Sequence, residues 1–164
     1  MKQVFVSVGT HTQQFDRLVK KIDEIALEEK ETIEFFGQTG NCLYQPKNFR
    51  FKKFLDDSEF EQKILESDLV IGHAGAGLII SCLAKKKKAI IMPRLKEFGE
   101  HTNSHQTDLA NALASKKKVL AVFFENDLKL AIGLSDEFVP LLEKGTDKII
   151  RGIEVFLLSK EQAV

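Results

Sequence analysis

Polar side chains that could recognise a ligand are concentrated between Pro93 and Gln106. The members of this cluster are Glu97, Glu100, His101, Asn103, His105 and Gln106. A solvated helix start needs only one or two polar capping residues, so a cluster of this size indicates a binding function. Imidazole and amide groups can both donate and accept hydrogen bonds. This capacity suits the recognition of a sugar better than charge alone would.

A second group of candidate ligand-binding residues follows the first apolar run of the chain, at "GTHT". Gly9 permits a tight turn at this point. Thr10, His11 and Thr12 then offer hydroxyl, imidazole and backbone N–H donors where a helix is expected to begin. Donors at a helix N-terminus form a natural anion site, so this stretch predicts contact with a phosphate or a similar group.

The third candidate stretch is "HAGAG", from His73 to Gly77. Gly75 and Gly77 lack the Cβ atoms that would keep a ligand away from the backbone beside His73 and Ala74. The stretch is not a Walker A loop, because no Gly-Lys-Ser/Thr closes it, and it lacks the third glycine of a dinucleotide fingerprint. Small residues at such a turn are more typical of simple packing. The polar cluster shifts the balance toward ligand binding.

Strands and helices must bring these three stretches together. The expected strands are 4–8, 32–36, 48–54, 68–72, 88–93 and 118–123. The expected helices are one with apolar spacing from Phe15 to Ala26, one capped by Ser58 with Glu61 as capping-box partner, and segments 75–84, 101–115 and about 146–160. Strands that alternate with helices predict an α/β fold with a Rossmann-like, doubly wound parallel sheet. We expect one domain over residues 1–164.

The predicted topology sorts the loops into two groups. Ligands of an open parallel sheet bind outside the carboxyl ends of its strands. The loops 9–14, 72–77 and 93–106 should therefore meet at the ligand edge. The lysine runs 85–88 and 116–118 should lie at the opposite edge, as solvated helix ends or, alternatively, as contacts to an anionic membrane surface.

Composition excludes several classes of protein. Lys plus Arg and Asp plus Glu number 24 each, so the chain has no global basic footprint for nucleic acid. No apolar stretch approaches the roughly 18 residues of a membrane span, and the N-terminus lacks a signal-peptide pattern. Cys42 and Cys82 show no metal-ligand spacing. Reduced thiols in a cytoplasmic protein are the favoured interpretation, with a redox pair as the alternative.

Four segments together resemble a known family. They are "FVSVGTHTQQFDRLVKKID", "GQTGNCLYQPKNFRFKKFL", "DLVIGHAGAG" and "MPRLKEFGEHTNSHQTDLANAL". The chain is similar, from residue 4 to about 115, to the small, donor-binding subunit of split GT-B glycosyltransferases. These are two-chain transferases of bacterial capsule and exopolysaccharide synthesis, of the glycosyltransferase family 28 C-terminal-domain type. They are related to the enzyme that adds the second N-acetylglucosamine to a dolichol-linked sugar.

The resemblance implies a function, a partner and a set of site residues. The donor would be a UDP-sugar bound without a metal, and the acceptor a lipid-linked saccharide. A membrane-associated acceptor-binding subunit would hold this cytoplasmic chain at the membrane. Gly9 and Thr10 would lie at the pyrophosphate and the interdomain cleft. The diphosphate and ribose region would be lined by His73, Ala74, Gly75 and Gly77. The nucleotide sugar would be approached by Glu97, Asn103, His105 and Gln106.

One departure from the family pattern keeps a second hypothesis open. Relatives carry Ser after "HAGAG" and, three residues later, a Glu suited to the ribose hydroxyls, whereas this chain has Leu78 and Ser81. Ser81 could make only a weaker or water-bridged contact, and a lost charged hydrogen bond typically costs about 1.5–3 kcal/mol. The alternative to a working transferase subunit is therefore a non-catalytic scaffold or regulatory subunit with a degenerate site.

Two histidines and the tail retain alternative roles. His11 could be the general base that deprotonates the acceptor or, as we favour, a contact to phosphate or the cleft. His101 could bind ligand or only cap its helix. The apolar stripe of the helix at about 146–160 could join the core or contact the partner subunit.

Overall fold

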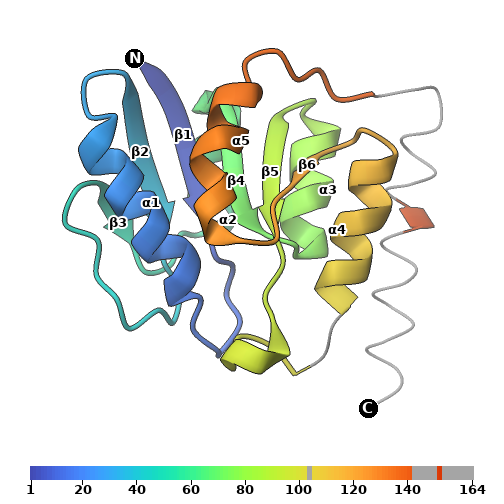
Figure 1. Ribbon diagram of the computed structural model, residues 1–164, viewed down its shortest axis with the longest axis horizontal. Coiled ribbons are helices and arrows are strands. Elements are labelled where there is room, and N and C mark those ends of the chain that lie inside the picture. Colours follow the sequence, from blue (N-terminus) through green and yellow to red (C-terminus); the bar gives the residue numbers. More distant parts are fainter. Residues whose placement is uncertain (103–104, 142–150, 153–164) are drawn as a thin grey trace.

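A computed structural model describes residues 1–102, 105–141 and 151–152 (Figure 1). The strands are β1 (Lys2–Ser7), β2 (Ile33–Gln38), β3 (Arg50–Lys52), β4 (Leu69–His73), β5 (Lys88–Met92) and β6 (Leu120–Ala121). The α-helices are α1 (Asp16–Glu28), α2 (Asp57–Glu66), α3 (Ala76–Ala84), α4 (His105–Ser115) and α5 (Leu128–Leu134). Two short 3-10 helices are η1 (Lys96–Phe98) and η2 (Glu125–Asp127).

The six strands form one parallel sheet in the order β3-β2-β1-β4-β5-β6. The predicted doubly wound α/β fold is therefore confirmed. The strand order reverses between β1 and β4, and this switch point is where such sheets bind ligands. Ser7 pairs with Gly72, and His73 pairs with Met92. The three central strands thus end at one level, and the loops that follow them leave the sheet side by side at the bottom of Figure 1.

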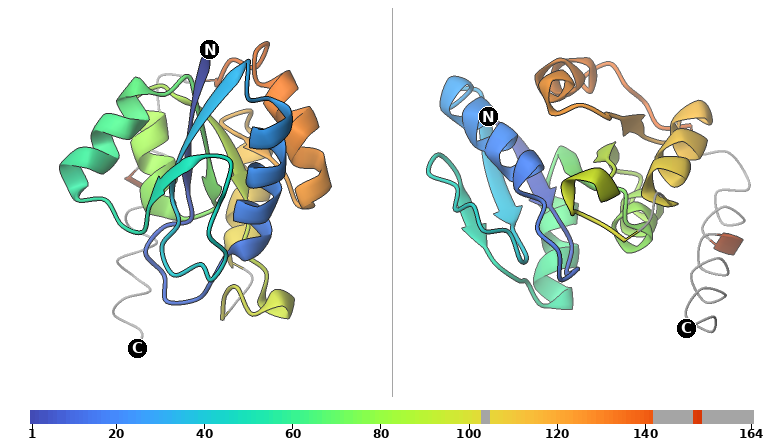
Figure 2. Two further views of the ribbon diagram at one scale, coloured as in Figure 1. Left: turned by 90° about the vertical axis from the view of Figure 1, so that its left-hand side faces the viewer. Right: turned by 60° about the horizontal axis from the view of Figure 1, so that its bottom comes forward.

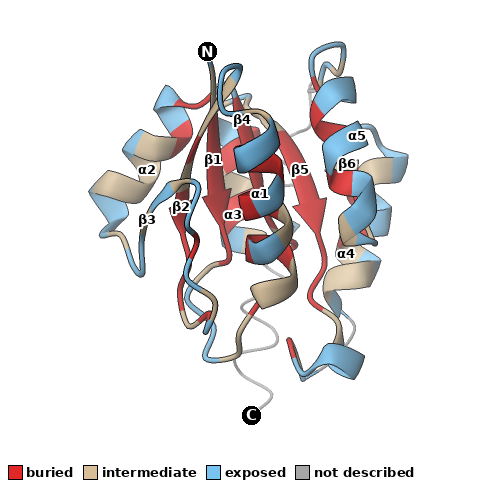
Figure 3. Cartoon of the chain, turned by 60° about the vertical axis from the view of Figure 1, so that its left-hand side comes forward, coloured by how far each residue is buried: buried red, intermediate tan, exposed pale blue. Residues whose placement is uncertain are grey.

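The sheet is buried on both faces, as continuous apolar strands require. Val4 and Val6 pack with α1 and α5, whereas Phe5 on the same strand packs with α2, α3 and α4. Figure 2 shows the two helical layers, and Figure 3 shows the buried strands between them. Cys42 and Cys82 belong to the cores on opposite faces of the sheet. This separation rules out the redox pair, and burial raises the pKa of the two thiols to about 11 and about 12.

Several predicted helix starts are wrong by a few residues. The N-cap of α2 is Asp56 and not Ser58, because the extended backbone at Asp56 lets its carboxylate accept from Glu59 N at 2.8 Å. The expected helix at 101–115 begins only at His105. The expected tail helix at about 146–160 lies outside the described residues, apart from residues 151 and 152, which are helical.

The lysine runs lie at the amino edge of the sheet, as predicted, but several of their ammonium groups are not simply solvated. Lys87 donates to Leu65 O and Ser67 O at the C-terminal end of α2, and Lys88 donates to Ser135 O and Asp136 O just beyond α5. These lysines satisfy carbonyls that helix ends leave without partners. Among the helices that the structure describes, none combines the length and apolar character needed to span a bilayer.

Candidate functional site

Three loops meet at the carboxyl edge of the sheet. The rings of His11, in the loop after β1, and His101, in the loop after β5, are stacked with centroids 5.0 Å apart. Gln14 Nε2 donates to Phe98 O at 3.4 Å between the same two loops. His73 lies at the end of β4, and besides burial its proximity to His101 and His11 contributes a small part of the lowering of its pKa. Three of the four histidines of the chain therefore gather at the switch point.

The N-terminus of α3 can receive an anion. Gly75 is its N-cap, no side chain caps the helix, and its first turn holds no acidic residue. A Cβ on Gly77 would meet nothing within 4 Å, so the space beside this residue is open. Backbone N–H groups and the positive end of the helix dipole can therefore be approached from the side of Gly77. This part of the prediction for "HAGAG" is consistent with the geometry.

The start of α1 has a different character, and the prediction of a helix N-terminus at residues 10–12 is wrong. The helix begins at Asp16, beyond an N-cap at Phe15. Phe15 N donates to Cys42 Sγ at 3.3 Å, and Asp16 N donates to Gln14 Oε1 at 2.6 Å. The amides of Phe15 and Asp16 are therefore occupied, and the carboxylate of Asp16 lies in the first turn, which disfavours an anion there.

The two glycines beside His73 make room for its imidazole. An ideal Cβ on Gly75 would lie 1.9 Å from His73 Nε2, and one on Gly9 would lie 2.6 Å from Cε1. Gly9 also has a φ of +76°, which other residues rarely adopt. We expected Gly75 to free space for a ligand, but the side chain of His73 takes that space. Of the two glycines in "HAGAG", Gly77 is the one that leaves open space for an approaching ligand.

His73 is held in a defined orientation at this position. Its Nδ1 lies 3.4 Å from Ser7 O, and because a carbonyl only accepts, Nδ1 carries the proton in this contact. Burial, aided by the positive charge of Arg94, lowers the pKa of His73 to about 4. The ring is therefore neutral near pH 7. Its Nε2, beside Gly75, is then an acceptor.

Sequence reasoning missed Arg94, whose side chain is fully buried. Its Nη2 donates to Val8 O at 2.7 Å, and its Nη1 donates to Gln13 O and Gln14 O at 2.8 and 2.9 Å. Nη1 also lies 3.2 Å from Glu100 O. An arginine directly after a buried strand is a weak signal, because arginine is common in exposed loops.

A buried ion pair lies next to Arg94 and was also missed. Arg17 Nε and Nη2 donate to the two carboxylate oxygens of Glu100 at 3.1 and 3.0 Å. The same arginine donates to Pro93 O and Phe123 O, and it pairs with the more exposed carboxylate of Glu125 at 3.2 Å. Glu100 belonged to the polar cluster interpreted as sugar-binding, but its carboxylate is only 1% exposed and serves this pair.

The other predicted site residues lie at the carboxyl edge with differing freedom. Thr10, Glu97 and His105 are exposed, and His105 is the first residue of α4. Gln106 Oε1 accepts from Arg94 N at 3.0 Å, which anchors this side chain while its amide nitrogen can still donate to a ligand. Ala74 is buried. Asn103 lies outside the described residues.

Ser81 faces α2 and not the open end of α3. Its hydroxyl donates to Glu61 Oε1 at 2.8 Å, and Glu61 also pairs with Lys85, which lowers the pKa of Glu61. Leu78 is buried, and its Cδ2 occupies the space that a Cβ on Gly72 would need. The two departures from the family pattern thus serve packing and a contact between helices.

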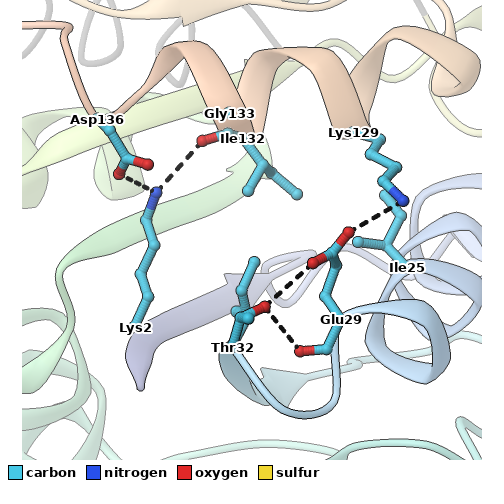
Figure 4. Close-up of a pocket in the computed structure, with 9 residues that line it drawn as sticks. Lys2, Ile25, Glu29, Thr32, Lys129, Ile132, Gly133 and Asp136 are labelled. Atoms are coloured by element: carbon cyan, nitrogen blue, oxygen red, sulfur yellow. Dashed lines mark hydrogen bonds and ion pairs between the residues drawn. The ribbon is translucent and has the colours of Figure 1, made fainter.

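No set of three metal-ligating side chains occurs in the described part of the chain. A hollow of about 370 Å³ lies at the opposite, amino edge, between β1, α1 and α5 (Figure 4). Its charged residues pair with each other, as in Lys2 with Asp136 at 2.6 Å and Lys129 with Glu29 at 2.9 Å. The carboxyl edge, with its uncapped helix and convergent loops, is the better candidate site.

Comparisons with known proteins point in the same direction. Residues 3–132 match the model of the glycosyltransferase family 28 C-terminal domain. In an alignment 124 positions long, which covers 69% of the chain, the sequence is 33% identical to UDP-N-acetylglucosamine transferase subunit ALG13 of Mus musculus, and likewise to that of Homo sapiens. The matched region is 10% of each of these relatives, so the chain spans a small part of their length.

Solved glycosyltransferase structures share the fold. MurG from Acinetobacter baumannii aligns with a TM-score of 0.58 and 20% identity, over 84% of this chain and 43% of MurG. The solution structure of ALG13 aligns with a TM-score of 0.57 and 18% identity, over 86% of this chain and 89% of that one. The glycosyltransferase of kitacinnamycin aligns with a TM-score of 0.62 and 15% identity, over 94% of this chain and 40% of the other.

Proposed function

Because this chain belongs to the glycosyltransferase family 28 C-terminal domain family, we propose that it is the donor-binding part of a glycosyltransferase. It takes a hexose from a UDP-sugar and passes it to a lipid-linked saccharide in glycan or polysaccharide synthesis. The ALG13 relatives are named as a subunit of a UDP-N-acetylglucosamine transferase, which supports N-acetylglucosamine as one donor sugar to test first.

One observation carries this proposal, namely the uncapped N-terminus of α3 at the sheet switch point. Its free amides and the open space at Gly77 fit a diphosphate. The helix dipole stabilises the negative charge that develops on the departing UDP, so the proposal requires no bound metal. His73 contributes a neutral ring at this position, and its Nε2 can accept from a ribose or sugar hydroxyl.

The polar residues around α3 receive roles by their places in the fold. Glu97, on η1, and His105, at the start of α4, are exposed and can approach the hexose. Gln106 can offer its amide N–H groups, and we assign Asn103 to the same group from the sequence. His11 is stacked on His101 between the loops after β1 and β5, and we assign it a contact to phosphate or the deprotonation of the acceptor.

A second polypeptide completes the enzyme in this proposal. The acceptor half of a GT-B enzyme would face the carboxyl edge and supply the lipid-linked saccharide. We infer that this acceptor-binding subunit is membrane-associated and holds the chain at the cytoplasmic face of the membrane. Capsule or exopolysaccharide synthesis is the pathway class that the sequence resemblance favours.

Calorimetric titration with UDP, uridine and UDP-N-acetylglucosamine in the presence of EDTA tests the proposal. UDP should bind, and uridine should bind at least tenfold more weakly because it lacks the diphosphate. Gly77→Ala should weaken UDP and leave uridine unchanged. The proposal fails if UDP produces neither heat nor a thermal shift at millimolar concentration. Sugar transfer by the purified chain alone would contradict the two-subunit part.

A non-catalytic scaffold or regulatory subunit is the second candidate function. Ser81 favours it, because the hydroxyl at this position is committed to Glu61 and offers no carboxylate to a ribose. This alternative predicts normal association with the partner subunit but no UDP binding by the isolated chain. Binding of UDP with discrimination against 2′,3′-dideoxy-UDP would exclude it, because the ribose would then be recognised.

A further inference from the structure

The buried guanidinium of Arg94 connects the loops that form the candidate site. Its bonds to Val8 O, Gln13 O and Gln14 O close the loop after β1 at both of its ends. The exposed residues between these carbonyls include Thr10 and His11. The shape of the loop therefore depends on the fork of donors that one arginine supplies.

The same residue connects to the loop after β5 and to α4. Nη1 donates to Glu100 O at 3.2 Å, and the backbone N of Arg94 donates to Gln106 Oε1 at 3.0 Å. The guanidinium also lies over the ring of Phe15, with Cζ 5.1 Å from its centroid. Arg94 thus contacts the residue before α1, the end of the loop after β5, and the first turn of α4.

The stability of the fold alone does not explain why the charge of Arg94 is buried. Burial lowers the pKa of Arg94, because desolvation disfavours the charged form of the guanidinium. The nearby carboxylate of Glu100 is bound by Arg17, and the acceptors recorded for the Arg94 side chain within the described residues are all carbonyls. Apolar residues of similar volume often match or exceed the stability of a buried charge.

The geometry points to Arg94 as a positioning residue for donor binding, an inference that rests on the proposed function. Arg94 does not contact the ligand in this proposal. It holds the loop after β1 and the loop after β5 at the separation that stacks His11 on His101 beside α3. A lysine at this position would keep the charge but could not reach all four carbonyls with one ammonium group.

Arg94→Lys is the main test, with UDP affinity measured by calorimetry at 10 °C. We expect at least a tenfold loss of affinity in a variant that remains folded by circular dichroism. Leu83→Ala is the matched control, because Leu83 is buried in the core near the far end of α3 and away from all three loops. This control should destabilise the fold while UDP affinity stays within twofold of the wild type.

Amide spectra test the same proposal without a ligand. In Arg94→Lys, the signals of residues 9–14 should shift and those of β2 should not, whereas Leu83→Ala should leave residues 9–14 unchanged. Unshifted loop signals in folded Arg94→Lys would overturn the positioning role. Wild-type UDP affinity in this variant, or an equal loss of affinity in the control, would overturn it as well.

If Arg94→Lys does not fold, Arg94→Ala with added guanidinium replaces it. Failure of guanidinium to restore the loop signals would then overturn the proposal. Absence of UDP binding by the wild type would instead refute the proposed function, while the spectra still decide the role of Arg94.

Discussion

Gly75→Ala should expel the imidazole of His73 from its position between two glycines. The added Cβ would lie 1.9 Å from Nε2 and 2.6 Å from Cδ2, and no real contact is that short. The ring cannot shift toward Gly9, because the Cε1 side is already close to that residue. It must therefore rotate toward solvent and lose its contact with Ser7 O.

The displacement should change the pKa of His73 more than the stability of the fold. The pKa is about 4 in the wild type, and in the variant it should rise toward the ordinary value of 6.5. At pH 7 the ring is neutral in both proteins, so the cost is roughly one hydrogen bond, or about 1 kcal/mol. At pH 5 the wild type loses up to about 2 kcal/mol, because its unfolded state binds a proton that the folded state excludes. The variant should then equal or exceed the wild type in stability.

Proton NMR titration of the histidine Cε1–H signals measures the pKa, and urea unfolding at pH 7 and pH 5 measures the stability. Gly77→Ala is the matched control, because a Cβ there meets no atom within 4 Å. It should leave the pKa of His73 unchanged and stabilise α3 by up to about 1 kcal/mol. A His73 pKa that stays near 4 in Gly75→Ala would refute the proposed packing of the ring.

Three further predictions concern stability. Glu100→Gln should lower the free energy of unfolding by about 1.5–3 kcal/mol, because it removes the buried one of the two carboxylates that pair with Arg17 and leaves only the more exposed Glu125; Glu24→Gln, at an exposed pair, should cost under about 1 kcal/mol, and similar losses in urea unfolding would contradict this. Asp23→Asn should lower the free energy of unfolding by about 1–3 kcal/mol and speed proteolysis of the segment 44–48, because Asp23 accepts hydrogen bonds from N–H and O–H groups of that segment. Unchanged cleavage would count against this anchoring role. His73 has a lowered folded pKa, so wild-type stability should fall as pH drops from 6.5 toward 4, and His73→Gln should flatten that decline; an unaltered pH profile would assign the acid sensitivity to other groups.

The pattern of apolar runs was enough to predict the fold. Strands such as 68–72 and 88–93 are continuous and bounded by turns, and only burial on both faces of a parallel sheet accommodates such runs. The loops of the ligand edge followed from that topology. The errors fell at helix starts, where one residue in extended conformation decides the cap, as at Asp56.

The interior of the site was less predictable. Glu100 and Gln106 look like ligand contacts in the sequence, but one binds Arg17 and the other binds the backbone of Arg94. These pairings join residues 83 and 12 positions apart, so no local spacing indicates them. The structure requires glycine at position 75 because a Cβ there would clash with His73, and not because a ligand approaches it.

The anchoring of the loops by backbone carbonyls has a consequence for how this protein can evolve. Arg94 donates hydrogen bonds to the peptide oxygens of Val8, Gln13 and Gln14, and every amino acid carries such an oxygen. The side chains at positions 10–12 can therefore diversify without altering the anchor. A mutant library confined to those positions and to 96–98 should yield a high fraction of folded clones, so that ligand preference can be varied on an unchanged scaffold.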